Sequence, residues 1–233
     1  KDTAALKAEG FTTVILAVGA SEPGVLRLEQ GEAKNALEFL ADFKANDGKL
    51  DIGKNVVVIG GGNTAMDTAR AAKRTTGVEH VYLVYRRTKR YMPADEEELV
   101  MAVEDGVEFM ELLSPVKLEN GKLICEVMVL GDMDASGRRG VVKTGELKEI
   151  PADTVIAAVG EKVPTALYKA NGINVNDRGR ALVNEETLET NVENVYVVGD
   201  GLGGPATVVE GIRDGLKAAQ AVIGETLVRD FDA

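Results

Sequence analysis

The sequence predicts an α/β fold, in which helices cover a parallel sheet and an antiparallel β-meander is inserted. Residues 55–85 run in the order strand, glycine turn, helix, strand, as in a parallel βαβ unit. The pair Asn120-Gly121 stands between two apolar runs, which is typical of a two-residue hairpin turn. The motif Thr-Val-Ile-x-Ala-Val-Gly occurs at residues 13–19 and again at 154–160. We interpret this repeat as two topologically related domains; two ordinary buried strands are the alternative.

Composition limits the class of protein. With 233 residues, 45% of them hydrophobic, the chain can bury a core and suits one large or two small domains. A formal net charge of -11 argues against a nucleic-acid partner, because phosphate contacts need a basic face. No apolar run reaches the roughly 18 residues of a membrane span. No charged-then-apolar leader opens the chain either, so we expect a cytoplasmic protein.

The single cysteine, Cys125, excludes an intramolecular disulfide and a C-x-x-C redox pair within this chain. A thiolate set for zinc or for an iron–sulfur cluster is excluded as well, and we predict no metal site. Cys125 lies in an alternating strand pattern, so we expect a buried structural thiol.

The residues before the glycine turn form a leading segment. We expect a helix end in residues 1–10, a strand in 11–20, a loop in 21–31, a helix in 33–43 and a polar crossing in 46–53. We therefore divide the chain into three parts: residues 1–52 as a segment of one domain, 53–155 as a second domain, and 156–233 as the C-terminal part of the first.

A phosphate-binding pattern follows the crossing. Residues 55–59 are apolar without alternation, as in a parallel strand covered on both faces. The spacing Gly60-x-Gly62-x-x-Ala65 is the small-residue form of the dinucleotide fingerprint. Gly60 permits the tight turn, Gly62 lets a pyrophosphate approach the backbone, and Ala65 keeps the helix close to the strand. The start of the helix adds free N–H groups and the positive end of its dipole. A purely structural glycine turn is the alternative.

The end of the second strand, residues 81–85, indicates which dinucleotide is bound. A site for NAD carries Asp or Glu here to accept from the ribose 2′-hydroxyl. This strand instead runs into a basic cluster without an acid, and guanidinium groups hold a 2′-phosphate with charge-assisted hydrogen bonds. NADP(H) is therefore favoured over NAD(H), with a solvated basic loop as the alternative. The cluster consists of Arg86, Arg87, Lys89 and Arg90.

The next elements are a helix and a meander. Pro93 and the acids at 95–98 are typical of a helix start, and Gly106 ends the helix. The acids could instead contact a substrate or a partner. Strands are expected at 107–113, 117–118, 123–130 and 141–150, with a long polar turn at 132–140. This meander should cover the nucleotide sheet.

The C-terminal part begins with a strand at 153–161. Turns follow at 172–180, then a strand at 194–199, a loop at 201–205 and a helix at 206–222. Asp200 stands at the carboxyl end of the 194–199 strand, where a carboxylate binds a polyol hydroxyl or caps a helix; both interpretations stay open.

Four motifs together resemble a known family. They are GGGNTAMD at 60–67, YRRTKRYMPA at 85–94, the two AVG turns, and VYVVGD at 195–200. The sequence resembles the pyridine-nucleotide and flavin domains of the glutamate synthase small subunit and dihydropyrimidine dehydrogenase. Within that group it is most similar to the flavoprotein subunit named as a selenate reductase. The resemblance covers residues 10–223. It implies a Rossmann-like FAD/NAD(P)-binding flavoprotein with two dinucleotide-binding domains.

The resemblance also implies a role for each motif. The glycine turn would hold the NADP pyrophosphate, the arginines would grip the 2′-phosphate, and the second AVG turn would pass near the nicotinamide. Residues after the last strand would meet the pyrophosphate, ribitol and isoalloxazine of FAD. The residues concerned are Gly60, Gly61, Gly62, Asn63 and Thr64; Arg86, Arg87 and Arg90; Ala158, Val159 and Gly160; and Gly199, Asp200, Thr207, Val208 and Val209.

The activity implied is hydride transfer from NADPH to FAD, followed by electron transfer to iron–sulfur centres in partner domains or subunits. We name no catalytic residue, because the cofactors carry this chemistry. The family opens with a second G-x-G-x-x-G turn for FAD that this sequence lacks, so we interpret the chain as an inactive fragment with an incomplete FAD domain. The alternative function is a non-catalytic NADP-binding or docking module with a vestigial flavin site. The possibility of a homodimer stays open.

Overall fold

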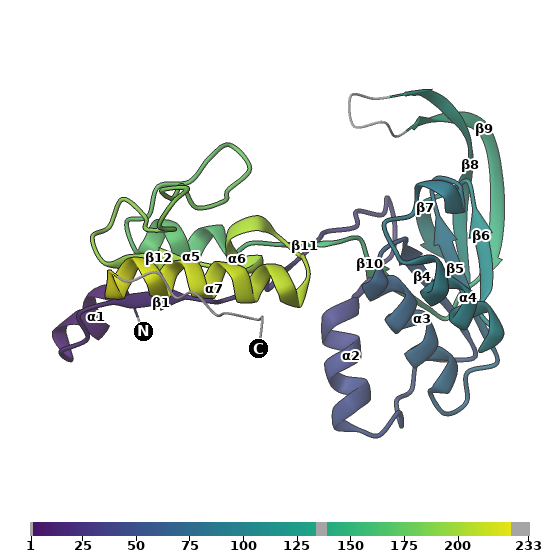
Figure 1. Ribbon diagram of the computed structural model, residues 1–233. Coiled ribbons are helices and arrows are strands. Elements are labelled where there is room, and N and C mark those ends of the chain that lie inside the picture. Colours follow the sequence, from purple (N-terminus) through teal and green to yellow (C-terminus); the bar gives the residue numbers. More distant parts are fainter. Residues whose placement is uncertain (1, 134–138, 225–233) are drawn as a thin grey trace, which may run out of the picture. The chain divides into compact units, whose positions relative to one another are not determined.

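A computed structural model describes residues 2–133 and 139–224 of the chain. The chain divides into two compact units (Figure 1). Unit 1 comprises Lys1–Glu22 and Glu161–Ala233, and unit 2 comprises Pro23–Gly160. β2 (Glu22–Pro23) and β11 (Glu161–Lys162) pair as a two-stranded sheet. No helix in the part of the chain that the structure describes is long and apolar enough to cross a membrane.

Unit 2 is built on a five-stranded parallel sheet. Its order is β3 (Lys34–Asn35), β10 (Thr154–Ala158), β4 (Asn55–Gly60), β5 (His80–Tyr85) and β6 (Glu108–Glu111). The first boundary between the units lies at residues 22–23, earlier than the boundary at residues 52–53 that we expect from the sequence. β3 belongs to this sheet, and the helix that follows it packs against the same core.

Helices cover one face of this sheet. These are α2 (Ala36–Ala45), α3 (Asn63–Arg74) and α4 (Glu96–Glu104). Alternate residues of the central strands point into this layer, with Val56 and Val58 of β4 packing against buried residues of α3 such as Ala65 and Met66. The absence of polar alternation in residues 55–59 is explained by burial on both faces of the sheet.

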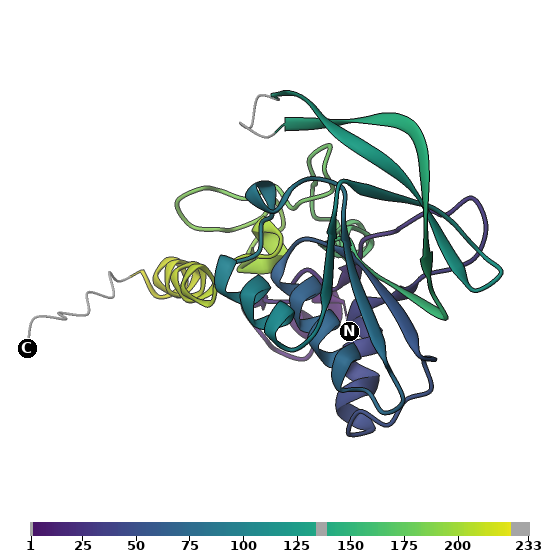
Figure 2. The same ribbon diagram turned by 90° about the vertical axis from the view of Figure 1, so that its right-hand side faces the viewer.

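The inserted meander covers the opposite face, as the sequence predicts. Its strands are β7 (Leu113–Glu119), β8 (Lys122–Met133) and β9 (Arg139–Pro151), paired antiparallel in that order. Val57 and Ile59 of β4 pack there against Leu123 and Cys125 of β8. Figures 1 and 2 show β8 and β9 as a long curved ribbon whose far end extends past the sheet.

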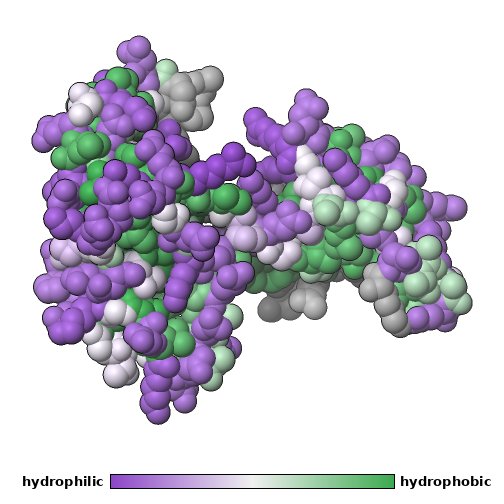
Figure 3. All heavy atoms as spheres, turned by 180° about the vertical axis from the view of Figure 1, so that it is seen from behind, coloured by the Kyte–Doolittle hydropathy of each residue, from purple (hydrophilic) through white to green (hydrophobic). Residues whose placement is uncertain are grey.

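Unit 1 contains a two-stranded parallel sheet, β1 (Val14–Leu16) with β12 (Val195–Val197). Its helices are α1 (Thr3–Ala8), α5 (Thr165–Ala170), α6 (Asp200–Gly203) and α7 (Val208–Ile223). Tyr168 of α5 is fully buried, and its hydroxyl donates to the Gly201 carbonyl at 2.7 Å. Hydrophobic side chains also reach the surface of each unit (Figure 3).

Several element boundaries differ from the sequence-based expectation. The strand expected at 11–20 is only Val14–Leu16, and α6 occupies part of the loop expected at 201–205. α5 lies in a stretch to which the sequence analysis assigns no element. Pro93 precedes α4 instead of starting it, because the residues after it bond to the glycine turn and the N-cap position falls at Asp95. The strand expected at 107–113 breaks at Leu112, whose φ of 59° ends β6 before β7 begins. The turn expected at 132–140 lies largely outside the described residues.

A close approach of three elements holds α3 on the sheet. A methyl group added at Gly60 would collide with the Ala158 carbonyl of β10 and would lie 2.9 Å from the Ala65 Cβ of α3. Ala65 is itself fully buried. Small residues at both positions are therefore required by the separation between the helix and the strands.

We expect Gly60→Ala to lower the free energy of unfolding of unit 2 by about 1–3 kcal/mol, because the added methyl overpacks a backbone contact. Denaturant unfolding measures the change. The control is Gly215→Ala in α7, where an added methyl meets no atom within 4 Å. That variant should stabilise unit 1 by about 0.5–1 kcal/mol through helix propensity. Equal effects of the two substitutions would contradict the packing argument.

Burial raises the pKa of the Cys125 thiol to about 12. Since the thiolate is the reactive form, the folded protein should resist iodoacetamide at about pH 8 and should react fully once unfolded. Mass spectrometry of the alkylated protein, with and without denaturant, makes the comparison. Rapid stoichiometric labelling of the folded chain would show that this thiol is accessible.

Candidate functional site

The candidate nucleotide site lies at the carboxyl edge of the unit 2 sheet. From β4 the chain moves through β5 to β6 in one direction, whereas β10 returns on the other side of β4. The strand order therefore reverses between β4 and β10. In open parallel sheets, ligands bind outside the carboxyl ends of the strands at such a reversal. Three of the predicted motifs follow the ends of β4, β5 and β10, so the fold brings them to this edge.

The glycine turn after β4 exposes backbone donors. The amide groups of Gly62 and Asn63 donate to no group among residues 2–133 and 139–224. A methyl group added at Gly62 would meet only the Pro93 ring, at 3.8 Å, so space is open beside this turn. The first turn of α3 contains no acidic residue. Unbonded amides at the positive end of a helix are suited to an anion such as a pyrophosphate.

A neighbouring segment, residues 91–95, is fastened to the same turn. The Ala94 amide donates to the Gly61 carbonyl at 3.0 Å. Asn63 and Asp95 exchange two hydrogen bonds: the Asn63 Nδ2 donates to the Asp95 Oδ2 at 3.1 Å, and the Asp95 amide donates to the Asn63 Oδ1 at 3.0 Å. The sequence pattern does not single out Asp95, because the acidic run at 95–98 is explained by the helix dipole of α4 alone.

Tyr85, the last residue of β5, is a second residue that the sequence pattern had not singled out. A methyl group at Gly61 would collide with its ring, so Tyr85 lies directly against the glycine turn. The Tyr85 hydroxyl donates to the Tyr91 carbonyl at 2.7 Å. An aromatic residue at the end of a strand, just before a basic cluster, was the available signal.

The arginines of the basic cluster after β5 differ in exposure and in hydrogen bonding. Arg86 and Arg90 are exposed, and within the described part of the chain their guanidinium groups form no hydrogen bond or ion pair. Arg87 is half-buried, and its Nε donates to the Arg139 carbonyl of β9 at 2.9 Å. Arg86 and Arg90 are thus available to an anion. Arg87 also attaches the meander to this strand end.

The second AVG turn lies beside the glycine turn. Ala158 pairs with Gly60 in the register of β10 and β4. After it, Val159 is 40% exposed and Gly160 has a φ of 94°, which favours glycine. The Gly24 amide donates to the Gly160 carbonyl at 2.7 Å, so the turn is held by the segment that follows β2.

The remaining predicted residues belong to unit 1. Gly199 is the N-cap residue of α6 and Asp200 is the first residue of that helix. The Asp200 Oδ1 accepts from the Ala206 amide at 3.1 Å, whereas its second oxygen accepts from no described residue. Thr207 caps α7 in a reciprocal capping box with Glu210. Val208 and Val209 are 80% and 75% exposed, and their amides donate to no described residue.

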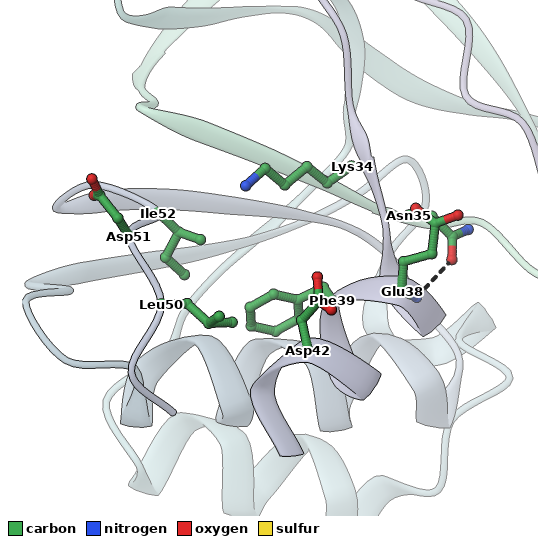
Figure 4. A pocket seen from close by; sticks show the side chains of 8 residues that line it. All are labelled: Lys34, Asn35, Glu38, Phe39, Asp42, Leu50, Asp51 and Ile52. Carbon is green, nitrogen blue, oxygen red and sulfur yellow. Dashed lines mark hydrogen bonds between the residues drawn. The ribbon is translucent and has the colours of Figure 1, made fainter. Parts of the chain in front are cut away.

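A separate cavity of about 310 Å³ lies in unit 2 beside α2 (Figure 4). The Phe39 ring points toward Leu50 at its floor, and Lys34 lies above. None of the predicted site residues lines it. The lining residues are Lys34, Asn35, Glu38, Phe39, Asp42, Leu50, Asp51 and Ile52.

Comparison with known proteins identifies relatives whose names all describe redox enzymes or their subunits. The chain is 37% identical over 228 residues to the Escherichia coli protein named "Putative oxidoreductase YgfK", covering 96% of this chain and 22% of that protein. It is 35% identical to the NADP(+)-dependent formate dehydrogenase subunit beta of Moorella thermoacetica, covering 91% and 31%. It is 37% identical to the glutamate synthase [NADPH] small chain of Azospirillum brasilense, covering 73% and 36%. The chain thus spans well under two thirds of these relatives.

Solved structures share the fold. FprA from Mycobacterium tuberculosis in complex with NADPH superposes with a TM-score of 0.74 at 21% identity, over 94% of this chain and 65% of FprA. Thioredoxin reductase from T. acidophilum gives 0.61 at 25% identity, over 93% and 66%. The family described as pyridine nucleotide-disulphide oxidoreductase matches residues 2–215. With the fingerprint geometry of unit 2, this match establishes that the chain belongs to the pyridine nucleotide-disulphide oxidoreductase family.

Proposed function

We propose that this chain is the NADPH-binding and partial flavin-binding module of an oxidoreductase that transfers hydride from NADPH to FAD. The observation that carries the proposal is the edge of the unit 2 sheet, where the unbonded amides of Gly62 and Asn63 stand beside a basic strand end. A dinucleotide with an additional 2′-phosphate needs both features. Membership of the oxidoreductase family supports the same conclusion.

The residues of unit 2 fit NADP(H). The amides at the start of α3 would receive the pyrophosphate, with Gly61 and Thr64 completing the turn. Arg86 and Arg90 would hold the 2′-phosphate, and the terminal nitrogens of Arg87 would add to them while its Nε keeps the bond to the Arg139 carbonyl. Residues 158–160 would lie along the nicotinamide half, where the partly exposed Val159 would exclude water.

The residues of unit 1 fit the ribityl and ring end of FAD. The second oxygen of Asp200 would accept from a ribityl hydroxyl, beside the backbone of Gly199. The unbonded amides of Val208 and Val209, which follow Thr207 at the positive end of α7, suit the electron-rich edge of an isoalloxazine. When bound, FAD supplies the hydride acceptor. The protein supplies orientation and exclusion of water.

The single cysteine of this chain has no part in the proposed reaction. Burial raises the pKa of Cys125 to about 12, so its thiolate is scarce at neutral pH. A dithiol couple cannot form from the cysteine content of this chain. Hydride transfer between nucleotide and flavin does not require one.

We extend the proposal to the whole protein on the basis of the family resemblance. Electrons leave FAD for iron–sulfur centres in partner domains or subunits, and selenate is the terminal acceptor that the resemblance suggests. The names of two relatives identify them as subunits or chains of larger enzymes, which supports partner domains here. A cytoplasmic location and a homodimer are further parts of the proposal.

Arg86→Ala with Arg90→Ala should raise the Kd for NADPH by about tenfold or more, because each charge-assisted bond contributes about 1.5–3 kcal/mol. The Kd for NADH should change by less than about twofold, because NADH has no 2′-phosphate. Isothermal titration calorimetry measures both constants. Arg178→Ala with Arg180→Ala removes two exposed arginines of unit 1 and serves as the charge-matched control.

Equal wild-type affinities for NADPH and NADH would remove the NADP assignment. So would an unchanged NADPH affinity in the double variant. If the wild-type chain binds neither nucleotide, the proposed function is wrong, and only the assignment of the fold stands.

The whole protein, purified from cells, should be yellow, and its flavin absorbance near about 450 nm should be bleached by NADPH under anaerobic conditions. Asp200→Ala should lower flavin occupancy, measured as the absorbance ratio to protein, because it removes the carboxylate next to the ribityl site. A colourless preparation that FAD cannot reconstitute, but that still binds NADPH, would favour the non-catalytic module.

A further inference from the structure

Residues 86–95 connect the two parts of the proposed nucleotide site. At one end the basic cluster follows β5 directly, and at the other end residues 91–95 bond to the glycine turn. Between them the Tyr85 hydroxyl donates to the Tyr91 carbonyl, which closes the intervening residues into a short loop. Arg86 and Arg90 therefore lie on a segment that is tied at both ends to the pyrophosphate turn.

The side chain of Asp95 bonds to the glycine turn instead of to its own helix. Asp95 occupies the N-cap position of α4, and aspartate is one of the best N-cap residues, yet its side chain makes no cap hydrogen bond. Its carboxylate instead accepts from Asn63 Nδ2, 32 positions earlier in the chain. The helix thus loses a contact worth about 1 kcal/mol in favour of a bond to the glycine turn.

The Asn63–Asp95 pair is reciprocal, so it fixes orientation as well as distance. One bond joins the two side chains at 3.1 Å, and the other joins the Asp95 amide to the Asn63 Oδ1 at 3.0 Å. Asn63 is the first residue of α3, the helix whose start is proposed to receive the pyrophosphate. The Ala94 amide adds a third bond, to the Gly61 carbonyl.

We propose that the Asn63–Asp95 pair and the Tyr85 hydroxyl are positioning groups that set the selectivity for NADPH over NADH. They hold the arginines of residues 86–90 at a constant spacing from the glycine turn, so one rigid dinucleotide can engage both. This inference rests on the proposed function. Fixing a binding segment before the ligand arrives raises affinity by reducing the ordering cost on binding.

The charge of Asp95 does not obscure the test. A carboxylate repels the pyrophosphate of NADPH and NADH alike, and it also repels the 2′-phosphate that only NADPH carries. Asp95→Ser and Asp95→Asn both remove this charge, so a difference between these two variants in the ratio of the NADPH and NADH dissociation constants does not come from the charge. Tyr85→Phe leaves the charge in place, so its ratio reports the placement of the arginines directly.

The experiment titrates the full chain with NADPH and with NADH by calorimetry and compares three variants with wild type. Asp95→Ser keeps a good N-cap residue but is too short to reach Asn63. Asp95→Asn keeps an acceptor oxygen of the right length and serves as the conservative rescue. Tyr85→Phe removes only the hydroxyl and keeps the ring against Gly61. Circular dichroism and thermal melting confirm folding.

We expect Asp95→Ser and Tyr85→Phe each to reduce the NADPH preference by about threefold to tenfold, mainly through a weaker NADPH affinity. Asp95→Asn should keep the preference within about twofold of wild type. Because Tyr85→Phe is a mild change, the measurement remains available if Asp95→Ser does not fold.

Two outcomes separate this inference from the proposed function. If wild type prefers NADPH, and folded Asp95→Ser or Tyr85→Phe keeps the full preference, the positioning role is wrong and the NADP site stands. The positioning role is also wrong if both variants weaken NADPH and NADH equally. If wild type itself shows no preference, the NADP assignment fails before the variants are compared.

Discussion

The contact between β4, β10 and the first turn of α3 is the constraint on which unit 2 depends. Gly60 approaches the Ala158 carbonyl and the Ala65 side chain so closely that neither neighbour leaves room for a methyl group. This contact brings the start of a helix to the carboxyl edge of the sheet, between two strands where the order reverses. The amides of Gly62 and Asn63, which follow this contact, have no acceptor among the residues that the structure describes.

The two faces of the sheet contribute differently to the site. The helical layer provides the start of α3 and, through α4, the residue Asp95 that binds Asn63. The meander on the opposite face receives Arg87 through the Arg139 carbonyl. A basic cluster at the end of β5 is thus shared between the structure and the proposed ligand. Arg86 and Arg90, whose guanidinium groups have no partner among the described residues, are left for the ligand.

Family membership and the residues of unit 2 both indicate a pyridine nucleotide. The family description also names a disulphide, whereas this chain contains one cysteine. Cys125 lies in the apolar cluster between β4 and the meander. Burial suppresses its ionisation, so it acts as a small hydrophobic side chain. In this chain, the fold of the pyridine nucleotide-disulphide oxidoreductase family is combined with a single, buried thiol.

Local sequence determined the strand, turn and helix around Gly60, the hairpin at Asn120-Gly121 and the layer that the meander forms. Each depends on residues close together in the chain, through burial pattern or backbone preference. Only the tertiary structure decided that Arg87 bonds to β9, that Tyr85 lies on Gly61, and that Asp95 binds Asn63 instead of capping its own helix. These contacts join residues far apart in sequence, and which of two hydrogen-bond partners a side chain takes depends on the geometry that packing brings about.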